Sequence, residues 1–182
     1  MSTTPTSSQP GRRVALLVTD GFEQVELTSP RDALRQAGAE PRIVSPKDGS
    51  VQGFNHDVKA DTFPVDLPLA QARAEDFDVL VLPGGVLNAD TLRTDEQAQA
   101  FVRAFDEAGK PIAVICHGAW LLIDAGLVQG RKLTSWPSLA TDLRNAGATW
   151  VDQEVVVDGR WVSSRKPDDL PAFNAKLLEC VR

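Results

Sequence analysis

The segment PIAVICHGAW, residues 111–120, contains the features that decide the fold. Its first half is an apolar, partly β-branched run, typical of a strand buried on both faces. Cys116, His117 and Gly118 follow directly, and a helical pattern begins after them. A buried strand that turns sharply into a helix raises the residue at the turn above the sheet, as in a nucleophile elbow. We therefore expect Cys116 at such an elbow, although Val114 stands where the pattern prefers a small residue.

Short apolar runs of the same kind recur along the chain, and helical patterns separate them. Buried strands are predicted at residues 13–19, 41–45, 77–85 and 111–115, the third ending in two glycines. Helices are predicted at residues 26–38, 94–110, 118–126 and 138–147. This alternation predicts an α/β fold with a mainly parallel sheet, helices on both faces and right-handed crossovers. Ligands of such sheets bind at the carboxyl ends of the strands, which is where Cys116 falls.

Particular residues set the expected helix boundaries. Pro30 is expected in the first turn of the helix at 26–38, where its missing N–H costs nothing. Thr94 is the expected N-cap of the helix at 94–110, and Gly109 its terminator.

Two hairpins are also predicted. Residues 51–54 and 57–63 form a hairpin or an irregular pair, with Gly53 and Asn55 in the turn. The dipeptide Asp158-Gly159 between two β-rich runs is a strong signal for the second hairpin.

The size and charge of the chain limit its class. Its 182 residues suffice for one domain, expected at residues 12–182, while the Ser, Thr and Pro-rich residues 1–11 are expected to form a disordered tail. The net charge of −6 argues against nucleic acid or an anionic membrane as a partner. No signal segment or membrane span is evident, and the two cysteines are expected as reduced thiols, so we expect a cytoplasmic protein.

Three strand ends carry unusual residues that a parallel sheet would bring to one edge: TDGFEQVE, PGG and CHG. A helix N-terminus beneath Cys116 would favour its thiolate, and hence a reactive cysteine. The alternative is a small buried hydrophobic residue, which is what most free core cysteines are. His117 offers a base for the thiol, although neighbouring side chains usually diverge and a lone histidine is more often a structural hydrogen-bonding group.

Glycines and acids next to the strand ends offer further groups for a site. Gly84 and Gly85 let backbone N–H groups approach a ligand, and the Gly85 and His117 amides would form an oxyanion hole; the alternative is a plain tight turn. Glu23 and Glu26 are either surface residues at a helix start or buried carboxyls, and a buried one would donate a hydrogen bond to sulfur when protonated.

The remaining aromatic and metal-binding residue types give weaker signals. Trp120 and Trp136 are candidates for a pocket wall, with core packing as the alternative. His56 and His117 with two distant cysteines show no ligand spacing, so we expect neither a metal nor a cofactor.

Five stretches in this order resemble one known family. FEQVEL, DVLVLPGG, GKPIAVICHG, LTSWP and EVVVDGRWVSSR are similar to the PfpI-type intracellular protease family of the DJ-1/PfpI superfamily, over residues 12–181. The resemblance implies a flavodoxin-like sandwich, with Cys116 as nucleophile, His117 as its partner and Glu26 in contact with the cysteine. It also implies association as a homodimer or higher homo-oligomer with the site near the subunit contact.

In this family an acidic residue after the PGG turn, donated by a neighbouring subunit, orients the histidine. Asp90 in VLNADTLR is the candidate here, but it is shorter than glutamate and lies in a loop that is one residue longer. If Asp90 does not reach His117, general-base catalysis is weakened.

The resemblance leaves three functions to compare. The first is a cysteine-dependent stress-response enzyme, of glyoxalase or deglycase type on 2-oxoaldehydes and their adducts, with an intracellular cysteine peptidase as the alternative. A site between subunits with few peptide-binding features favours small electrophiles. The second is a redox sensor or chaperone that uses an oxidisable Cys116 without turnover. The third is a binding module on a widespread fold.

Overall fold

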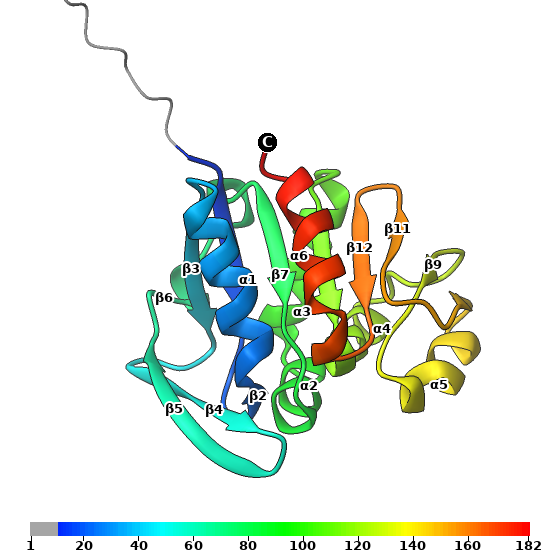
Figure 1. Ribbon diagram of the computed structural model, residues 1–182, viewed down its shortest axis with the longest axis horizontal. Helices are drawn as coiled ribbons and strands as arrows, with labels where there is room; N and C mark the ends of the chain where they lie inside the picture. The colour runs from blue at the N-terminus through cyan, green and yellow to red at the C-terminus, as the bar shows by residue number, and fades with distance from the viewer. Residues whose placement is uncertain (1–10) are drawn as a thin grey trace, which may run out of the picture.

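A seven-stranded sheet forms the centre of the computed structural model, which describes residues 11–182 (Figure 1). In spatial order its strands are β11 (Val156–Asp158), β12 (Trp161–Ser164), β8 (Ile112–Ile115), β7 (Val79–Leu82), β1 (Arg13–Leu17), β3 (Glu40–Ser45) and β6 (Leu67–Pro68). All neighbours are parallel except β11 and β12. Strands β3, β1, β7, β8 and β12 follow the flavodoxin-like 2-1-3-4-5 order, so the predicted fold class is confirmed.

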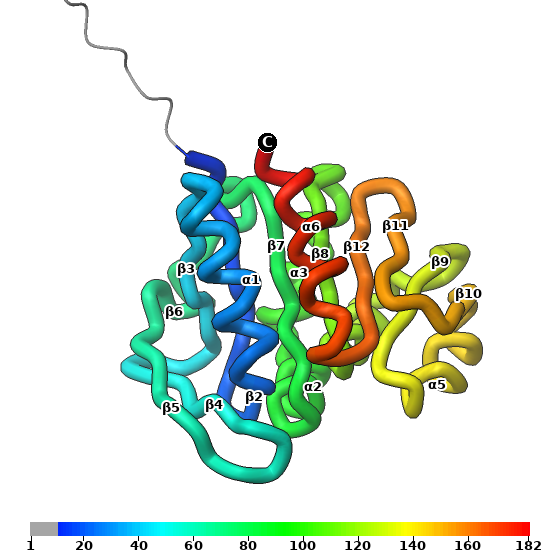
Figure 2. The backbone as a smooth tube through the Cα atoms, viewed as in Figure 1, coloured from blue at the N-terminus to red at the C-terminus, as the bar shows by residue number. Residues whose placement is uncertain are grey.

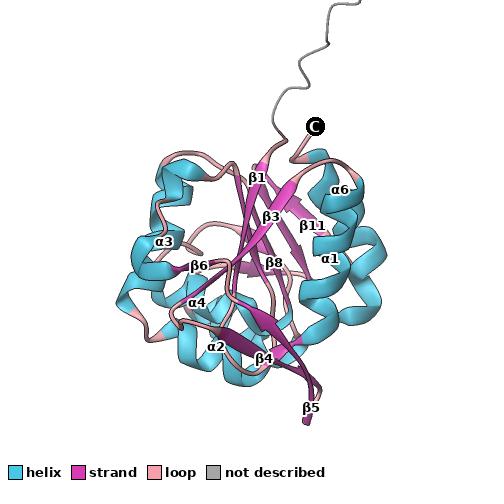
Figure 3. Ribbon diagram, turned by 90° about the vertical axis from the view of Figure 1, so that its left-hand side faces the viewer, coloured by secondary structure: helices cyan, strands magenta, loops and turns pink. Residues whose placement is uncertain are grey.

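Helices cover both faces of this sheet (Figure 3). Helices α1 (Gln24–Gln36) and α6 (Leu170–Glu179) pack on one face, while α2 (Val86–Arg93), α3 (Glu96–Glu107) and α4 (Ala119–Asp124) pack on the other. Helix α5 (Ala140–Asn145) adjoins the two-stranded sheet of β9 (Lys132–Leu133) and β10 (Thr149–Trp150). Short 3-10 turns span Leu69–Gln71, Ala74–Asp76, Cys116–Gly118, Pro137–Leu139 and Pro167–Asp169.

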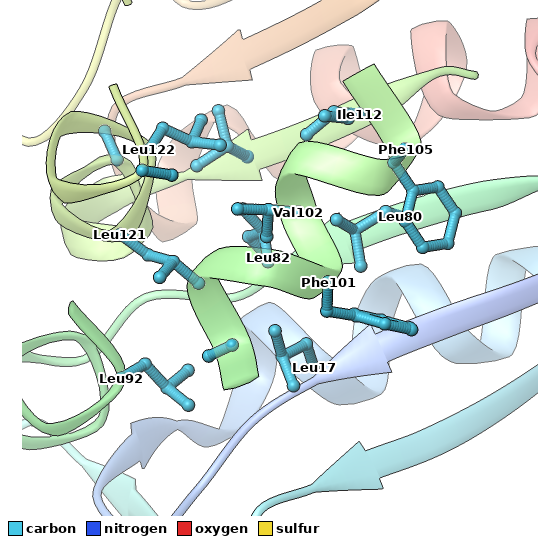
Figure 4. Packing of buried hydrophobic residues seen from close by; sticks show 14 of the residues in the cluster. Leu17, Leu80, Leu82, Leu92, Phe101, Val102, Phe105, Ile112, Leu121 and Leu122 are labelled. Carbon is cyan, nitrogen blue, oxygen red and sulfur yellow. The ribbon is translucent and has the colours of Figure 1, made fainter. Parts of the chain in front are cut away.

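Each central strand contributes side chains to two separate hydrophobic cores, one on each face of the sheet, because successive side chains point to opposite faces. Ala15 and Leu17 of β1 belong to the core under α3 and α4, whereas Val14 and Leu16 belong to the core under α1 and α6. Figure 4 shows the first core, in which α3 presents Phe101, Val102 and Phe105, all buried, to leucines of the sheet. Burial on both faces explains why these strands appear in the sequence as uninterrupted apolar runs.

The carboxyl ends of β1, β7 and β8 meet at one edge of the sheet, opposite the edge where the described chain begins and ends (Figure 2). A three-stranded sheet of β2 (Phe22–Glu23), β4 (Ser50–Asn55) and β5 (Val58–Pro64) projects beside this edge. Among the described residues, no helix combines the length and hydropathy that a membrane span needs.

Two helix boundaries differ from the sequence-based expectation. Helix α1 begins at Gln24, so Pro30 lies in its interior rather than in the first turn. Pro30 is buried there, and its packing offsets the lost hydrogen bond. The cap of α3 is Asp95, whose carboxylate accepts the Ala98 N–H at 3.0 Å, whereas the Thr94 hydroxyl donates back to the Thr91 carbonyl.

The β4–β5 hairpin forms as predicted, but its turn lies further along the chain. Asn55 pairs with Val58, so His56 and Asp57 make the turn, while Gly53 stands inside β4 beside a register shift. The backbone φ of His56 is +58°, a left-handed conformation that favours glycine or asparagine. A histidine is not a typical residue for this conformation, so the turn was expected at Gly53 and Asn55 instead. The second hairpin, β11–β12, has Gly159 in its turn as predicted.

Two further expectations concern segments around these elements. The stretch VLNADTLR was expected to be a loop, but it forms helix α2, whose Asn88, Ala89 and Leu92 are buried. The expected disordered tail lies outside the described residues, apart from Gly11.

Candidate active site

Cys116 occupies a sharp turn between β8 and α4. It is one of two non-glycine residues in the described chain with positive φ, at +61°, and its side chain is only 6% exposed. Gly118 permits this turn because a Cβ there would lie 2.7 Å from the Leu82 carbonyl oxygen. The buried strand β8, the positive φ of Cys116 and the close backbone contact at Gly118, two residues later, together form the geometry of a nucleophile elbow.

The turn brings the side chains of Cys116 and His117 together. The sulfur lies 3.2 Å from His117 Nδ1. Burial lowers the pKa of His117, so its imidazole is neutral at neutral pH. In the tautomer with its proton on Nε2, Nδ1 accepts the thiol proton. The two neighbours thus make the contact that adjacency alone does not guarantee.

Two tryptophans hold the His117 ring. Trp136 stacks on it with ring centres 5.7 Å apart and an interplanar angle of 24°, and Trp120 meets it edge-on at 5.2 Å. Trp120 is itself fixed, since its indole N–H donates to Asp142 at 3.1 Å and the Arg93 guanidinium lies over its ring. Of the two predicted pocket residues, Trp136 lines the cavity described below and Trp120 packs behind the imidazole.

Glu26 lies on α1 and is fully buried beside the cysteine. Its Oε1 accepts the Gly84 N–H at 2.9 Å, while its Oε2 has no hydrogen-bond partner among the described residues. Burial raises the pKa of Glu26 to about 8, so the carboxyl keeps its proton at neutral pH. Of the two readings left open by the sequence, the structure shows the buried carboxyl.

The thiol has an environment different from the one expected. Burial raises the pKa of Cys116, and a charge on Glu26 would raise it further, while the N–H groups of Gly85 and His117 lower it. Burial is the largest of these effects, so the pKa of the thiol lies above its ordinary value, whereas a helix N-terminus was expected to lower it. The resting site is therefore a neutral thiol beside a neutral imidazole and a protonated carboxyl.

The PGG turn approaches the cysteine so closely that glycine is required. A Cβ on Gly84 would lie 2.6 Å from the Cys116 Cβ and 2.6 Å from Glu26 Oε1. Gly85 has φ of +87°, and a Cβ there would lie 2.4 Å from the Gly21 carbonyl oxygen. Both positions thus keep the backbone near the sulfur.

Asn88 of α2 fixes this turn and was not anticipated from the sequence. The residue is fully buried, and its Oδ1 accepts the Thr19 N–H at 2.7 Å. Its Nδ2 donates to the carbonyls of Pro83 at 3.3 Å and Gly84 at 3.0 Å. Asn88 therefore joins the ends of β1 and β7, and its only sequence signal is a polar residue three positions after Gly85.

A cavity of about 530 Å³ opens over the cysteine; we call it the active-site cavity. Its lining comprises Gly21, Glu23, Glu26, Phe54, His56, Asp57, Gly85, Val86, Leu87, Cys116, His117, Trp136 and Pro167. The hairpin residues Phe54, His56 and Asp57 were not predicted to line the site, because they are distant in sequence from Cys116. The turn of their hairpin was also predicted at other residues. A larger hollow of about 860 Å³, at the opposite edge of the sheet near Arg12 and Arg182, contains no nucleophile.

Within a single chain, Asp90 does not belong to the site formed by Cys116, His117 and Glu26. It lies exposed on α2 and does not line the active-site cavity. Within residues 11–182, no carboxylate hydrogen-bonds the His117 ring, and no group of three His, Cys, Asp or Glu side chains is arranged to hold a metal. The orientation of His117 in one chain therefore depends on the two tryptophans.

Comparisons with known proteins match nearly the whole chain. The sequence model of the DJ-1/PfpI family matches residues 12–180. "Deglycase PH1704" of Pyrococcus horikoshii is 43% identical over 171 residues, which cover 93% of this chain and 99% of that protein. "Putative cysteine protease YraA" of Bacillus subtilis is 40% identical over 171 residues, covering 94% and 99%. The crystal structure of Drosophila melanogaster DJ-1beta aligns with a TM-score of 0.85 and 30% identity, over 94% of this chain and 90% of that one.

Proposed function

The chain belongs to the DJ-1/PfpI family, and from that premise we propose that it is a cysteine-dependent stress-response enzyme of deglycase type. Its substrates are 2-oxoaldehydes and their adducts with thiols and amines. The observation that carries this proposal is the 3.2 Å contact between Cys116 Sγ and His117 Nδ1 at the base of the active-site cavity. A thiol in contact with a base is the arrangement that nucleophilic attack on a carbonyl carbon requires.

Attack begins from the neutral thiol. The sulfur bonds to the aldehyde carbon, the carbonyl π electrons move to oxygen, and the thiol proton passes to His117 Nδ1. The N–H groups of Gly85 and His117 lie beside the sulfur and are available to the oxyanion. When the substrate is an adduct, Cys116 replaces the thiol or amine on the same carbon, and that group leaves with the proton.

The later steps need no external oxidant. The proton on the former aldehyde carbon is removed, and the electron pair that it leaves forms an enediolate with the neighbouring ketone. Protonation of the ketone carbon and its oxygen, with loss of the hydroxyl proton from the first carbon, oxidises the first carbon and reduces the second. The product is a thioester of a 2-hydroxy acid on Cys116. Water adds to this thioester and expels the sulfur, which regains a proton. The neutral imidazole and the protonated Glu26 next to the sulfur are the groups available to move these protons.

The size of the cavity, about 530 Å³, suits small substrates better than folded protein. The tip of the β4–β5 hairpin and the first residues of α2 both line it beside the sulfur. Peptide hydrolysis would use the same nucleophile, and the name of the Bacillus subtilis relative makes it the alternative activity to test.

The test measures turnover of methylglyoxal, its hemithioacetals and a fluorogenic peptide by purified protein. We expect 2-hydroxy acid from the aldehyde, and loss of at least 100-fold in kcat/KM on Cys116→Ser, as for removal of a nucleophile. Cys180→Ser is the matched control, because Cys180 is the second free thiol of the described chain and lies in the C-terminal segment. Turnover of the peptide alone would show that the activity is that of a peptidase and not of a deglycase. The absence of any Cys116-dependent turnover would refute the proposal that the protein is an enzyme.

One observation also favours a redox role. The unpartnered Oε2 of the protonated Glu26 is available to an oxygen added to the neighbouring sulfur. Peroxide would convert the thiol to sulfenic acid with release of water, and a second peroxide would give sulfinic acid. Intact-protein mass spectrometry after mild peroxide checks this: oxygen addition at Cys116 without any turnover would favour a sensor over an enzyme.

We place this chemistry in the cytoplasm, since both cysteines are free thiols in the structure. We further propose that the active protein contains two or more copies of the chain, because the apolar side chains at the mouth of the cavity, Val86 and Leu87, are 52% and 59% exposed.

A further inference from the structure

The active-site cavity carries acidic groups on the side away from the β8 elbow. Glu23 of β2 and Asp57 of the β4–β5 turn both line it, and no lysine or arginine is among its lining residues. Near the lining residue Pro167, Arg165 is paired with Asp152 at 2.7 Å and with Asp169 at 2.9 Å. Lys166, which directly precedes Pro167, has Asp168 as its partner at 3.8 Å. Both cations beside Pro167 are thus paired with aspartates, and the lining residues of the cavity carry a net negative charge.

Hydrogen bonds hold Glu23 and the β4–β5 hairpin in place. The His56 N–H donates to Glu23 Oε2 at 3.1 Å, which ties the hairpin tip to β2. Gln24 pairs with Asp61 in both directions, since its Nε2 donates to the carboxylate at 2.8 Å and its Oε1 accepts the backbone N–H at 2.8 Å. Asp57 follows His56 in the turn, so the bond to Glu23 positions its backbone beside the cavity, while its side chain is exposed there.

A second observation points to a ligand at this place. Glu26 is completely buried, lines the same cavity, and its Oε2 lacks a hydrogen-bond partner within the described chain. The charge of Glu23 contributes to the raised pKa of Glu26, so the field of Glu23 reaches the atoms next to the sulfur. A substrate bound against Glu26 thus lies within the influence of the acidic side of the cavity.

We propose that Glu23 and Asp57 form a cation subsite that selects carbonyl adducts bearing a guanidinium or ammonium group away from the reacting carbon. Two carboxylates in a lining that contains no lysine or arginine attract a positive group and repel an anionic one. This inference rests on the proposed deglycase function for its substrates, but the charge selectivity at Cys116 is a property of the cavity itself.

The first experiment uses three hemithioacetals of methylglyoxal that share the reacting carbon and differ in charge. Their thiols are thiocholine, which is cationic, 2-mercaptoethanol, which is neutral, and 3-mercaptopropionate, which is anionic. We expect kcat/KM to fall in that order for the wild-type protein. In the double variant Glu23→Gln, Asp57→Asn, the ratio of the cationic to the anionic substrate should fall roughly tenfold, and high salt should reduce the wild-type ratio as well.

Asp48→Asn is the matched control. Asp48 is an exposed carboxylate just before the same hairpin and does not line the cavity, so its loss should leave the ratio unchanged. A wild-type protein that turns over the neutral hemithioacetal without any charge ranking would overturn the subsite and leave the deglycase function intact.

A second measurement needs no turnover. Cationic, neutral and anionic methanethiosulfonates react with thiols, and their rates at Cys116 are compared in a Cys180→Ser background. We expect the double variant to slow the cationic reagent and accelerate the anionic one, each by roughly threefold or more. If the wild type and the double variant have the same rate ratios, the subsite is refuted whether or not the protein is an enzyme. If turnover fails but this ranking holds, the failure belongs to the proposed function alone.

Discussion

Glu26 illustrates how one buried residue changes the chemistry of its neighbours. Its side chain is on a helix, where the sequence equally allowed a solvated acid at a helix start, and only the packing of α1 against the sheet removes it from water. Once buried it keeps a proton, and the proton spares Cys116 from a neighbouring negative charge. The reactivity of the sulfur thus depends on the protonation state of Glu26, whether or not Glu26 contacts the substrate.

Stability should fall with rising pH because of Glu26. The folded chain holds this proton up to about pH 8, whereas the unfolded chain loses it near 4.5, so the folded state binds more protons between these values. The free energy of unfolding should therefore decrease across this window by up to about 5 kcal/mol. Urea unfolding at a series of pH values checks this. Glu26→Gln should remove most of the decrease, and parallel curves for the two proteins would contradict the assignment.

Activity should decline over the alkaline end of the same window. As Glu26 ionises near pH 8, its charge raises the pKa of the Cys116 thiol and makes proton transfer to His117 harder. In Glu26→Gln, kcat/KM should therefore no longer decrease at alkaline pH, which a pH profile of kcat/KM measures. An alkaline limb at the same pH in the variant would show that another group is responsible.

Gly84→Ala should damage both stability and activity. The added Cβ would lie 2.6 Å from Cys116 Cβ and 2.9 Å from the Ile115 carbonyl oxygen, contacts that the rigid backbone cannot relieve. Overpacking of this kind costs about 1–3 kcal/mol and moves the sulfur away from His117. Denaturant unfolding and kcat/KM measure the two effects. Gly109→Ala is the control: nothing lies within 4 Å and only its φ of +65° is strained, so stability falls while activity persists.

At the scale of elements, the cap of α3 provides a direct comparison of two adjacent residues. Asp95→Ala should cost about 1 kcal/mol, because its carboxylate satisfies the Ala98 N–H at 3.0 Å. Thr94→Ala should be close to neutral, since the Thr94 hydroxyl bonds only to the Thr91 carbonyl at an exposed position. Thermal unfolding of both variants decides between the observed cap and the one expected from the sequence, and equal losses would contradict the observed cap.

The elements that the sequence predicted correctly are those whose signal is local. The central strands are uninterrupted apolar runs, and the Asp158-Gly159 hairpin has a glycine in its turn. Helix α2 was missed because it is short and begins directly after Gly85. The His56-Asp57 turn was missed because a histidine at positive φ is held there by the bond to Glu23, a contact between distant residues.

The same distinction between local and long-range signals applies to the site. The strand-end rule brought Cys116, Gly84 and Glu26 to one edge without knowledge of any contact. The ionisation of the thiol could not be predicted, because it depends on how completely the pocket excludes water. The acidic hairpin tip over the cavity depends on a turn that carries no sequence signal.

At the scale of the whole molecule, the apolar mouth of the active-site cavity should be an interface. Leu87→Glu should convert an assembly of two or more copies into monomers, because it places a charge on a side chain that is 59% exposed in the single chain. Sedimentation velocity measures the mass. Val157→Glu, at a similar exposure of 51% on β11 and away from the cavity, is the control. Equal masses for the two variants would contradict this interface.

Loss of assembly should also lower kcat/KM if a neighbouring Asp90 orients His117. Asp90 is exposed on the same helix as Leu87, which leaves its carboxylate available to another copy. Asp90→Asn in the assembled protein should then reproduce the kinetic loss of Leu87→Glu without the change in mass. Full activity in Asp90→Asn would leave the two tryptophans as sufficient supports for the imidazole.

The left-handed backbone at Cys116 has a consequence for how the protein ages. A cysteine at φ of +61° is held there by the close backbone contacts at Gly84 and Gly118, and not by its own preference. We expect mild warming to relax the elbow before either core unfolds. Activity should then be lost at a lower temperature than the far-UV circular dichroism signal, and coincident losses would contradict this.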